Sequence, residues 1–310
     1  MDEITNFDLP SLPRIFRLTS YTAKVIDHKH TECTATLFHE KASMKVRWTT
    51  ASPDTRIKPN RLVSPRWNAC RSCDEEGVLR ISRLVLIERP EAMENLFETV
   101  PSGWVRNRKL VGEARALIEA LPRGHRHLFN AIFWDGERFR RFCMGPSSMN
   151  GHHNTDSGNL QHAVDVAKMM REHCGARDIT NTPLATLSAL LHDAGKADEY
   201  RLNQNGEWKL SDRGRLLGHK VTVIEWIASA MARYRIMLPA PHYMALLHCL
   251  TASQSAPEWL GIRKPAMLEA MMLSNMDRLS GTSDLIKRCA ANDGWGKFHP
   301  HIGSPTYSVM

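Results

Sequence analysis

Histidine and aspartate recur inside apolar segments in the second half of the chain. Each of these segments repeats its apolar residues with the spacing of a helix, so the polar side chain lies on or beside a buried face. The side chains concerned are His162, His192, Asp193, His219, His248 and Asp277. A buried carboxylate requires a counter-charge, and imidazole with carboxylate suits Mn²⁺, Fe²⁺, Co²⁺ or Zn²⁺. The sequence therefore predicts that several helices bring these groups together around a divalent metal ion.

A helical module must position these groups, and a different module precedes it. Residues 14–50 and 78–88 carry β-branched and aromatic residues in partial alternation, which predicts about four to five strands and a small β-barrel. The stretch between them contains several prolines and has no periodicity, so we expect an irregular insertion. The apolar period then becomes helical, and no segment after residue 150 alternates as a strand does. We therefore predict an α+β protein, with a β module at 1–100 and an all-α module at 101–310.

Length and composition exclude several classes of protein. The chain has 310 residues, of which 42% are hydrophobic and 24% charged, so it can bury a normal globular core. No apolar stretch approaches the ~18 residues that a membrane span requires, and the acidic N-terminus lacks the pattern of a secretory signal. Seven cysteines favour reduced thiols over a disulfide framework. Cys70 and Cys73 have the spacing of half a zinc site, with free loop thiols as the alternative. We expect a cytoplasmic protein without membrane association.

The net charge of +8 is concentrated rather than spread. Residues 101–141 hold nine basic side chains against four acidic ones. A second basic stretch, between Arg56 and Arg71, includes Arg66 and Trp67. Basic grooves with aromatic side chains bind single-stranded nucleic acid, so Arg66 and Trp67 are candidate substrate-binding residues. A solvated basic loop that serves solubility is the alternative.

The motifs of the helical module resemble those of a known enzyme superfamily. His162, the pair His192-Asp193 in LLHDAGKADEY, and Asp277 follow the order of the metal ligands in the HD superfamily of metal-dependent phosphohydrolases. GHHNTDSGNLQHAVDVA is similar to the opening motif of the YhaM-type 3′→5′ exonucleases of that superfamily, and LLGHKV and ALLHC resemble its next two histidine motifs. The resemblance implies an OB-like β-barrel at the N-terminus and an HD-domain helical bundle after it.

Carried over residue by residue, the resemblance implies a centre of one or two divalent metal ions. The implied ligands of the first metal are His162, His192, Asp193 and Asp277. Asp193 would bridge to a second metal bound by His219 and His248. Two positions depart from the family, because Asn159 replaces a glycine and Cys249 replaces a histidine. A thiolate selects softer metals than an imidazole does.

Further residues are assigned to catalysis and substrate binding. Asp193 and Lys196 would be catalytic, since Lys196 follows Asp193 by three residues and can hold the scissile phosphate as a point charge. The alternative for Lys196 is a cation at a helix end. The family pattern implies that His152 and His153 line the substrate channel, whereas the sequence alone marks them as ordinary loop residues.

Together these features predict a metal-dependent phosphodiesterase that degrades single-stranded RNA or DNA from the 3′ end. Mn²⁺ is the expected ion, and Fe²⁺, Co²⁺, Zn²⁺ and Mg²⁺ are the alternatives. One alternative is an HD-type nucleotidase acting on free nucleotides, although a mononucleotide needs no additional barrel. The other is a non-catalytic protein that binds nucleic acid or assists conjugation. Cys249 keeps this alternative open, because a degraded second metal site would leave binding without cleavage. Whether the chain forms a homo-oligomer also stays open.

Overall fold

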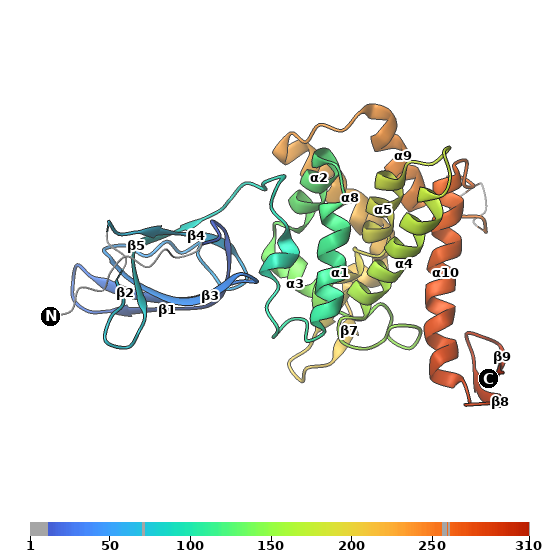
Figure 1. The fold of residues 1–310 in the computed structure, drawn as a ribbon, viewed down its shortest axis with the longest axis horizontal. Helices are drawn as coiled ribbons and strands as arrows, with labels where there is room; N and C mark the ends of the chain where they lie inside the picture. The colour runs from blue at the N-terminus through green and yellow to red at the C-terminus, as the bar shows by residue number, and fades with distance from the viewer. Residues whose placement is uncertain (1–11, 70–71, 256–258, 260, 310) are drawn as a thin grey trace. The chain divides into compact units, whose positions relative to one another are not determined.

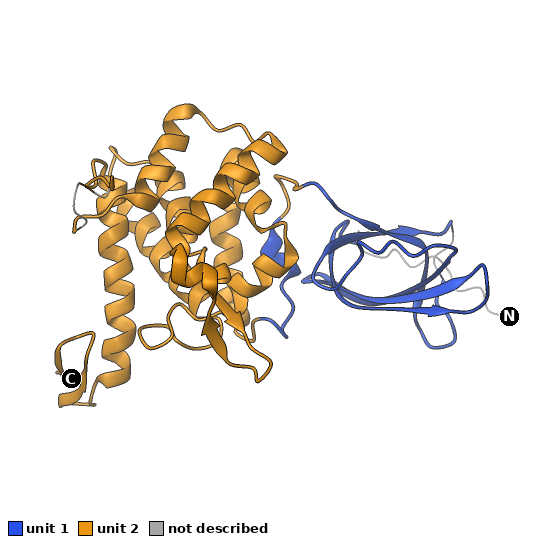
Figure 2. Ribbon diagram, turned by 180° about the vertical axis from the view of Figure 1, so that it is seen from behind, with its two compact units in different colours: residues 1–89, 95–104 blue, residues 90–94, 105–310 orange. Residues whose placement is uncertain are grey.

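The chain divides into two compact units of different secondary structure. The computed structural model describes residues 12–69, 72–255, 259 and 261–309. The first unit holds residues 1–89 and 95–104, and the second holds residues 90–94 and 105–310, as the colours of Figure 2 show. The first unit contains a closed β-barrel, and the second contains the described α-helices. The fold is therefore of mixed α and β type, as predicted.

Five strands form the barrel of the first unit (Figure 1). They are β1 (Phe16–Val25), β2 (Thr31–His39), β3 (Ala42–Thr50), β4 (Leu62–Trp67) and β5 (Leu79–Leu86), and a short 3₁₀ helix, η1 (Leu96–Thr99), follows them. The order around the barrel is β1-β2-β3-β5-β4, with β4 closing onto β1. β3 and β5 are parallel, and the other neighbouring strands are antiparallel. This topology is consistent with the predicted OB-like barrel.

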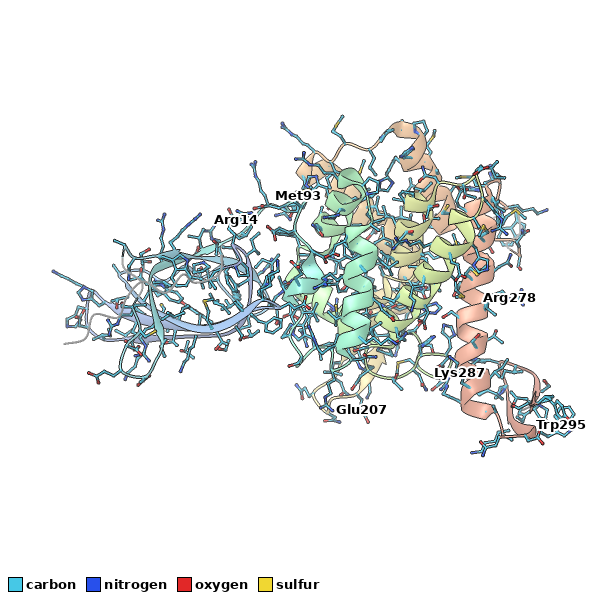
Figure 3. The ribbon with its side chains drawn as sticks, viewed as in Figure 1. Arg14, Met93, Glu207, Arg278, Lys287 and Trp295 are labelled. Carbon is cyan, nitrogen blue, oxygen red and sulfur yellow. The ribbon has the colours of Figure 1, made fainter. Side chains whose placement is uncertain are left out.

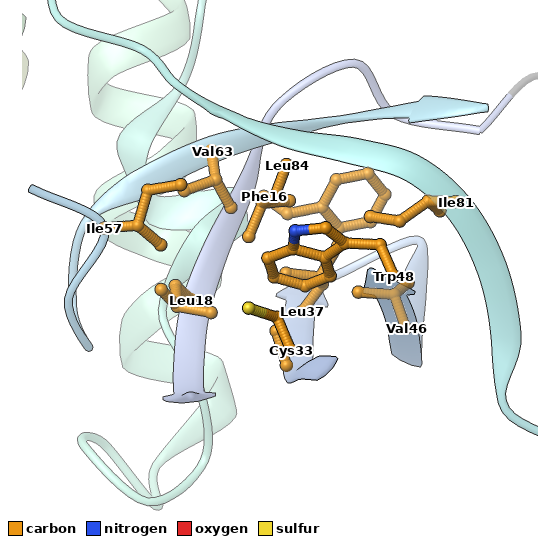
Figure 4. Close-up of a cluster of buried hydrophobic side chains, with 11 residues drawn as sticks. Phe16, Leu18, Cys33, Leu37, Val46, Trp48, Ile57, Val63, Ile81 and Leu84 are labelled. Atoms are coloured by element: carbon orange, nitrogen blue, oxygen red, sulfur yellow. The ribbon is translucent and has the colours of Figure 1, made fainter. Parts of the chain in front are cut away.

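Alternate side chains of these strands fill the barrel. On β2, Cys33, Ala35 and Leu37 are buried, whereas the residues between them are less so. This alternation is that of a strand with one face turned inward. Trp48 of β3 lies among the aliphatic side chains of the interior (Figure 4). The first unit therefore has a hydrophobic core of its own.

β4 lies in the stretch that the sequence marks as an irregular insertion, and that expectation is wrong at this position. Pro65 explains the error, because a residue without an N–H normally argues against a strand. β4 pairs with β1 only at Leu62 and Val63, whereas Pro65 pairs with Leu84 of β5. Pro65 therefore lies where one side of β4 is an edge, and its missing N–H costs no ladder hydrogen bond there.

Helices make up most of the second unit. Over its described residues they are α1 (Arg108–Glu119), α2 (Arg123–Phe133), α3 (Gly136–Met144), α4 (Gly158–Gly175), α5 (Thr182–Leu191), α6 (Lys196–Glu199), α7 (Asp212–Leu216), α8 (Gly218–Tyr234), α9 (Ala240–Thr251) and α10 (Leu268–Cys289). α4 packs against α1, α3, α5 and α10, and α10 also packs against α5 (Figure 1). α4, α5 and α10 are thus mutual neighbours, and side chains from all three can meet.

Two short hairpins interrupt the helical unit, so the prediction of an all-α module is wrong at these places. β6 (Tyr200–Leu202) pairs with β7 (Trp208–Leu210), and β8 (Gly294–His299) pairs with β9 (Ser304–Ser308). Strands of three residues are too short to show an alternating pattern. In the second hairpin, glycines and a bulge break the alternation.

The sequence predicts no membrane span and reduced cysteine thiols. Among the described helices, none combines the length and the apolar character needed to cross a lipid bilayer. The described cysteines are free thiols, of which Cys73 is exposed and the others are buried. Cys70, which has the spacing of half a zinc site with Cys73, lies outside the described residues, so the choice between a zinc site and free loop thiols stays open.

Candidate metal centre

Four side chains from three separate parts of the second unit meet at one point. They are His162 on α4, His192 and Asp193 directly after α5, and Asp277 on α10, and their ligand atoms lie within 4.8 Å of one another. His162 Nε2 lies 3.0 Å from Asp277 Oδ1, 3.2 Å from His192 Nε2 and 3.4 Å from Asp193 Oδ2. His162, His192 and Asp193 are buried and Asp277 is half-buried. Solvent therefore reaches the centre on the side of Asp277.

The apolar helix α5 positions His192 and Asp193. Its residues from Leu184 to Leu191 are buried, which fixes the helix inside the unit. Asn181 caps the helix by accepting a hydrogen bond from the Leu184 N–H at 3.0 Å. The N–H of His192 donates to the carbonyl of Ser188 and continues the helical pattern to the end of α5. The turn that follows is therefore anchored at the buried end of α5, where both ligand residues stand.

Hydrogen bonds of the two histidines direct one nitrogen of each ring toward the centre. His192 Nδ1 lies 2.7 Å from the carbonyl oxygen of Ala189, and since a carbonyl only accepts, Nδ1 carries the proton. His162 Nδ1 lies 3.0 Å from Ser280 Oγ. The two Nε2 atoms are left facing each other at 3.2 Å, beside the carboxylate oxygens. Two imidazole nitrogens and two carboxylates at this spacing form a donor set that fits a divalent cation.

The charges of the cluster shift the pKa values of its members. Burial favours the neutral form of Asp193, but the positive charges of Lys196 and His192 outweigh it and hold the pKa of Asp193 well below its usual value. Burial also opposes ionisation of Asp277, yet hydrogen bonds from His162 and His192 lower its pKa. Burial lowers the pKa of His192, and the charge of Asp193 more than reverses that effect. Both carboxylates are therefore ionised at neutral pH, as metal ligands must be.

Lys196 and His219 contact different oxygens of Asp193. Lys196 Nζ lies 2.5 Å from Asp193 Oδ2 and 3.3 Å from Ser147 Oγ. His219, in the first turn of α8, places Nε2 3.3 Å from Asp193 Oδ1, and its Nδ1 lies 2.8 Å from Glu199 Oε2. One oxygen of Asp193 thus faces the four-residue cluster, and the other faces an additional imidazole.

Gly195 permits the close approach of α8 to this turn. A Cβ at Gly195 would lie 2.1 Å from the carbonyl oxygen of His219, so the backbone would have to move. We expect Gly195→Ala to lower the free energy of unfolding by about 1–3 kcal/mol, measured by urea denaturation. Gly112→Ala in α1 is the control, because its added Cβ meets nothing within 4 Å and should stabilise the helix by roughly 0.5–1 kcal/mol. Equal responses of the two variants would contradict the tight packing at Gly195.

His152 and His153 reach the centre from the loop before α4. Their ring centroids lie 4.8 Å and 5.3 Å from that of His162. The backbone N–H of His153 donates to Asp284 Oδ2 at 2.8 Å, and His152 Nε2 lies 3.5 Å from Ser147 Oγ. Burial, reinforced by the charge of His162, lowers the pKa of His152 to about 4, so this ring is neutral at pH 7. Both rings form part of the wall of the centre rather than of its donor set.

The structure does not bring His248 into the donor set. His248 Nε2 accepts a hydrogen bond from the Ala266 N–H at 2.8 Å. The adjacent Cys249 is buried, and burial raises the pKa of its thiol to about 11, so Cys249 is a neutral packing residue at pH 7. Of the residues implied for a second metal, the structure places only Asp193 and His219 together.

Arg66 and Trp67 belong to β4 in the first unit. Arg66 is exposed and stands directly opposite Arg83 of β5, which is also exposed. Trp67 is half-buried and packs against the core of the barrel. The barrel therefore presents two cations on adjacent strands, and the indole contributes to packing.

Several polar residues around the centre are not predicted from the sequence. They are Ser147, Glu199, Ser280 and Asp284, each in contact with a predicted site residue. Ser280 follows Asp277 by three residues on α10, so helical periodicity was a usable signal for it. The other contacts join segments far apart in the sequence, and no linear pattern indicates them.

Comparison with known proteins gives a distant relationship. The 3′-5′ exoribonuclease YhaM of Bacillus licheniformis is 25% identical over 149 residues, which are 48% of this chain and 46% of that protein. YhaM of Geobacillus sp. is 24% identical over 163 residues (53% and 49%), and YhaM of Listeria innocua is 22% identical over 157 residues (51% and 49%). The chain spans about half the length of the curated relatives it matches. No family model and no solved structure matches the chain.

Proposed function

We propose that this chain is a metal-dependent phosphodiesterase that degrades single-stranded nucleic acid from the 3′ end. In this proposal the second unit is an HD-type phosphohydrolase domain, and the barrel is an OB-like module that holds the strand. The observation that carries the proposal is the meeting of His162, His192, Asp193 and Asp277 from three separate segments. The distant relationship with proteins named as 3′-5′ exoribonucleases supports it.

The four-residue cluster would hold the catalytic ion. Its nitrogen and oxygen donors suit Mn²⁺, the ion we propose first, and also Fe²⁺, Co²⁺, Zn²⁺ or Mg²⁺. When bound, such an ion would supply Lewis acidity toward a phosphate oxygen. It would also lower the pKa of water, so that hydroxide is available as the nucleophile near neutral pH. Asp193 Oδ1 and His219 would contribute to a second ion. His248 would have to release the Ala266 N–H before its Nε2 could join them.

The chain's own side chains would bind and orient the phosphate. Lys196 contacts Asp193 of the cluster, and we assign its ammonium group to a non-bridging oxygen of the scissile phosphate. Ser147 contacts the same ammonium group and keeps it in place. His152, neutral at pH 7, would line the substrate channel as a hydrogen-bonding ring without a positive charge.

The surface of the barrel favours an anionic partner. Arg66 and Arg83 stand opposite each other on adjacent strands, and like charges in that position repel unless an anion lies between them. A phosphate backbone supplies that anion in a sequence-independent way. Arg66 is therefore the substrate-binding residue that we assign to the barrel, with the half-buried Trp67 as an aromatic neighbour.

Digestion of labelled oligonucleotides tests the proposal. Single-stranded RNA and DNA carrying a 5′ label, incubated with the full chain and Mn²⁺, should give a ladder of products shortened from the 3′ end. EDTA should stop the reaction, and a blocked 3′ end should slow it. Cleavage that survives EDTA would contradict the metal centre, and internal cuts that appear first would contradict the 3′→5′ direction. Hydrolysis of free nucleotides with intact oligonucleotides would instead favour a nucleotidase.

Metal binding should also be visible without catalysis. Adding Mn²⁺ at about 100 times its Kd should stabilise the metal-free protein by about 2.7 kcal/mol, which is roughly 5–10 °C in Tm for a unit of this size. Cys249→Ser should keep this shift because Cys249 lies outside the donor set, whereas His162→Gln should lose it. Differential scanning fluorimetry measures the Tm shift of both variants. Loss of the shift in Cys249→Ser would mean that the thiol is a metal ligand.

A further inference from the structure

The hairpin β8–β9 exposes an unusual group of aromatic side chains. Trp295 is 71% exposed, Phe298 61% and Tyr307 60%. Figure 3 shows Trp295 at the outer edge of the unit, beside the C-terminal end of α10. Large aromatic side chains gathered on a surface mark a binding site more often than scattered ones do.

The register of the hairpin places these rings on one face. Trp295 pairs directly with Tyr307, and their ring centroids lie 4.9 Å apart in an edge-to-face arrangement. Phe298 pairs with Pro305, which lies two residues from Tyr307 and so on the same face. A bulge between Trp295 and Phe298 makes this possible, because without the extra residue Phe298 would turn to the other face. The hairpin therefore has one aromatic face.

The opposite face is fixed to the end of α10. Thr306, between Pro305 and Tyr307, is buried. A Cβ at Gly296 would lie 2.1 Å from the carbonyl oxygen of Cys289, the last residue of α10. Only glycine fits at that distance, so the hairpin lies directly against the helix end. Packing against the end of α10 therefore holds the aromatic face outward.

The end of α10 and the hairpin turn both lie against the loop that borders the metal centre. Arg288, in the last turn of α10, donates to the Gly151 carbonyl at 2.6 Å and to Asn154 Oδ1 at 3.0 Å. His301, in the hairpin turn, would lie 3.3 Å from a Cβ at Gly151. Gly151 directly precedes the two histidines that line the centre. Along α10 itself, Asp277 lies 12 residues before the helix end, about 18 Å at 1.5 Å per residue.

The charge of this region matches a phosphate backbone. Residues 284–309 hold Lys287, Arg288 and Lys297 against Asp284 and Asp293, and Arg288 pairs with Asp284 at 3.0 Å. Lys287, in the last turn of α10, and Lys297, between Trp295 and Phe298 in the sequence, are exposed. Exposed rings on which bases stack, flanked by cations that follow the backbone, are the features that bind single strands without sequence preference.

We infer that the aromatic face of β8–β9 is a second binding surface for single-stranded nucleic acid. The rings of Trp295 and Tyr307 would stack on bases, and Lys297 would contact phosphate. A strand engaged there would reach the metal centre past the Gly151 loop. The inference rests on the proposed function for the direction of the strand, but binding at this face can be measured without cleavage.

Fluorescence anisotropy with the full chain in EDTA tests it. The probe is a labelled single-stranded oligonucleotide longer than about 16 nucleotides, so that it can occupy more than one surface. We expect Trp295→Ala to raise Kd about five-fold or more, and Lys297→Ala to flatten the dependence of log Kd on log salt by about 0.7. Trp295→Phe should recover most of the affinity, because it keeps a stacking ring.

Trp259→Ala is the matched control, since Trp259 is 82% exposed elsewhere in the same unit. Its Kd should equal that of the unaltered chain. Equal Kd for Trp295→Ala, Lys297→Ala and the control would overturn the inference. So would a loss of dimers, or of binding to anionic vesicles, in Trp295→Ala at unchanged oligonucleotide affinity. Weakened binding in a chain that cleaves nothing would uphold the inference and reject only the proposed activity.

Discussion

Replacing Asp193 by asparagine is expected to reduce oligonucleotide cleavage by at least about 1,000-fold. Asp193 Oδ2 lies 3.4 Å from His162 Nε2 and 2.5 Å from Lys196 Nζ, and Oδ1 lies 3.3 Å from His219 Nε2. One carboxylate therefore contacts the four-residue cluster, Lys196 and the additional imidazole at once. Asparagine keeps the shape but removes the negative charge with which Asp193 would hold a divalent ion. Loss of several kcal/mol of metal-dependent stabilisation corresponds to a factor of this size.

Asp178→Asn provides the matched control, because Asp178 is an exposed carboxylate in the same unit. Rates on a single-stranded oligonucleotide with Mn²⁺, and the bound metal per chain, should be unchanged in this control. Asp193→Asn should lose both. Thermal unfolding of the metal-free proteins shows whether each variant is folded. Full cleavage by a folded Asp193→Asn protein would mean that Asp193 has no role in catalysis.

The sequence was most informative where a pattern repeats over many residues. The strands of residues 14–50 and the long helices carry period 2 and period 3.6 over enough positions to be read directly. β4 was hidden because Pro65 is tolerated only at an edge, and the edge is created by how far β1 extends. The hairpin β8–β9 was hidden because its aromatic face depends on a bulge, and a bulge interrupts the alternation that identifies a strand.

The residues of the donor set were also predicted from a pattern in the sequence. His162, His192 and Asp277 could be singled out because each is a polar residue in an otherwise apolar helical segment, where an uncompensated group is costly. The same reasoning also selected His248, yet its nitrogen accepts from a backbone N–H instead. A histidine on an apolar segment shows only that some partner exists. The identity of that partner depends on which helices pack together, and no single segment contains that information.

Gly195 shows how one small residue connects the parts of the centre. Because it has no side chain, the carbonyl of His219 can lie against the turn that carries Asp193. The imidazole of His219 then reaches Asp193 Oδ1, and Glu199 of the short helix α6 holds its other nitrogen. The additional imidazole is therefore positioned by backbone packing as well as by its own hydrogen bonds. This explains how the start of α8 can lie directly against the turn that follows α5.

Lys196→Gln is expected to separate catalysis from metal binding. We expect cleavage to fall about 100- to 1,000-fold, the usual effect of removing one group that stabilises transition-state charge. Metal affinity should stay the same or rise, because the ammonium group 2.5 Å from Asp193 Oδ2 competes with a cation for that oxygen. Cleavage assays and titration with Mn²⁺ measure the two quantities independently.

Lys220→Gln is the control, because Lys220 is an exposed lysine on α8 next to His219 in sequence, and it should change neither quantity. Lys196→Arg should recover part of the rate, since a guanidinium keeps the positive charge but not the compact ammonium geometry. If Lys196 were only a helix-end cation, Lys196→Gln would lower stability slightly and leave the rate intact. A parallel fall in rate and metal affinity would instead mean that Lys196 acts by positioning Asp193, and would reject its assignment to the phosphate.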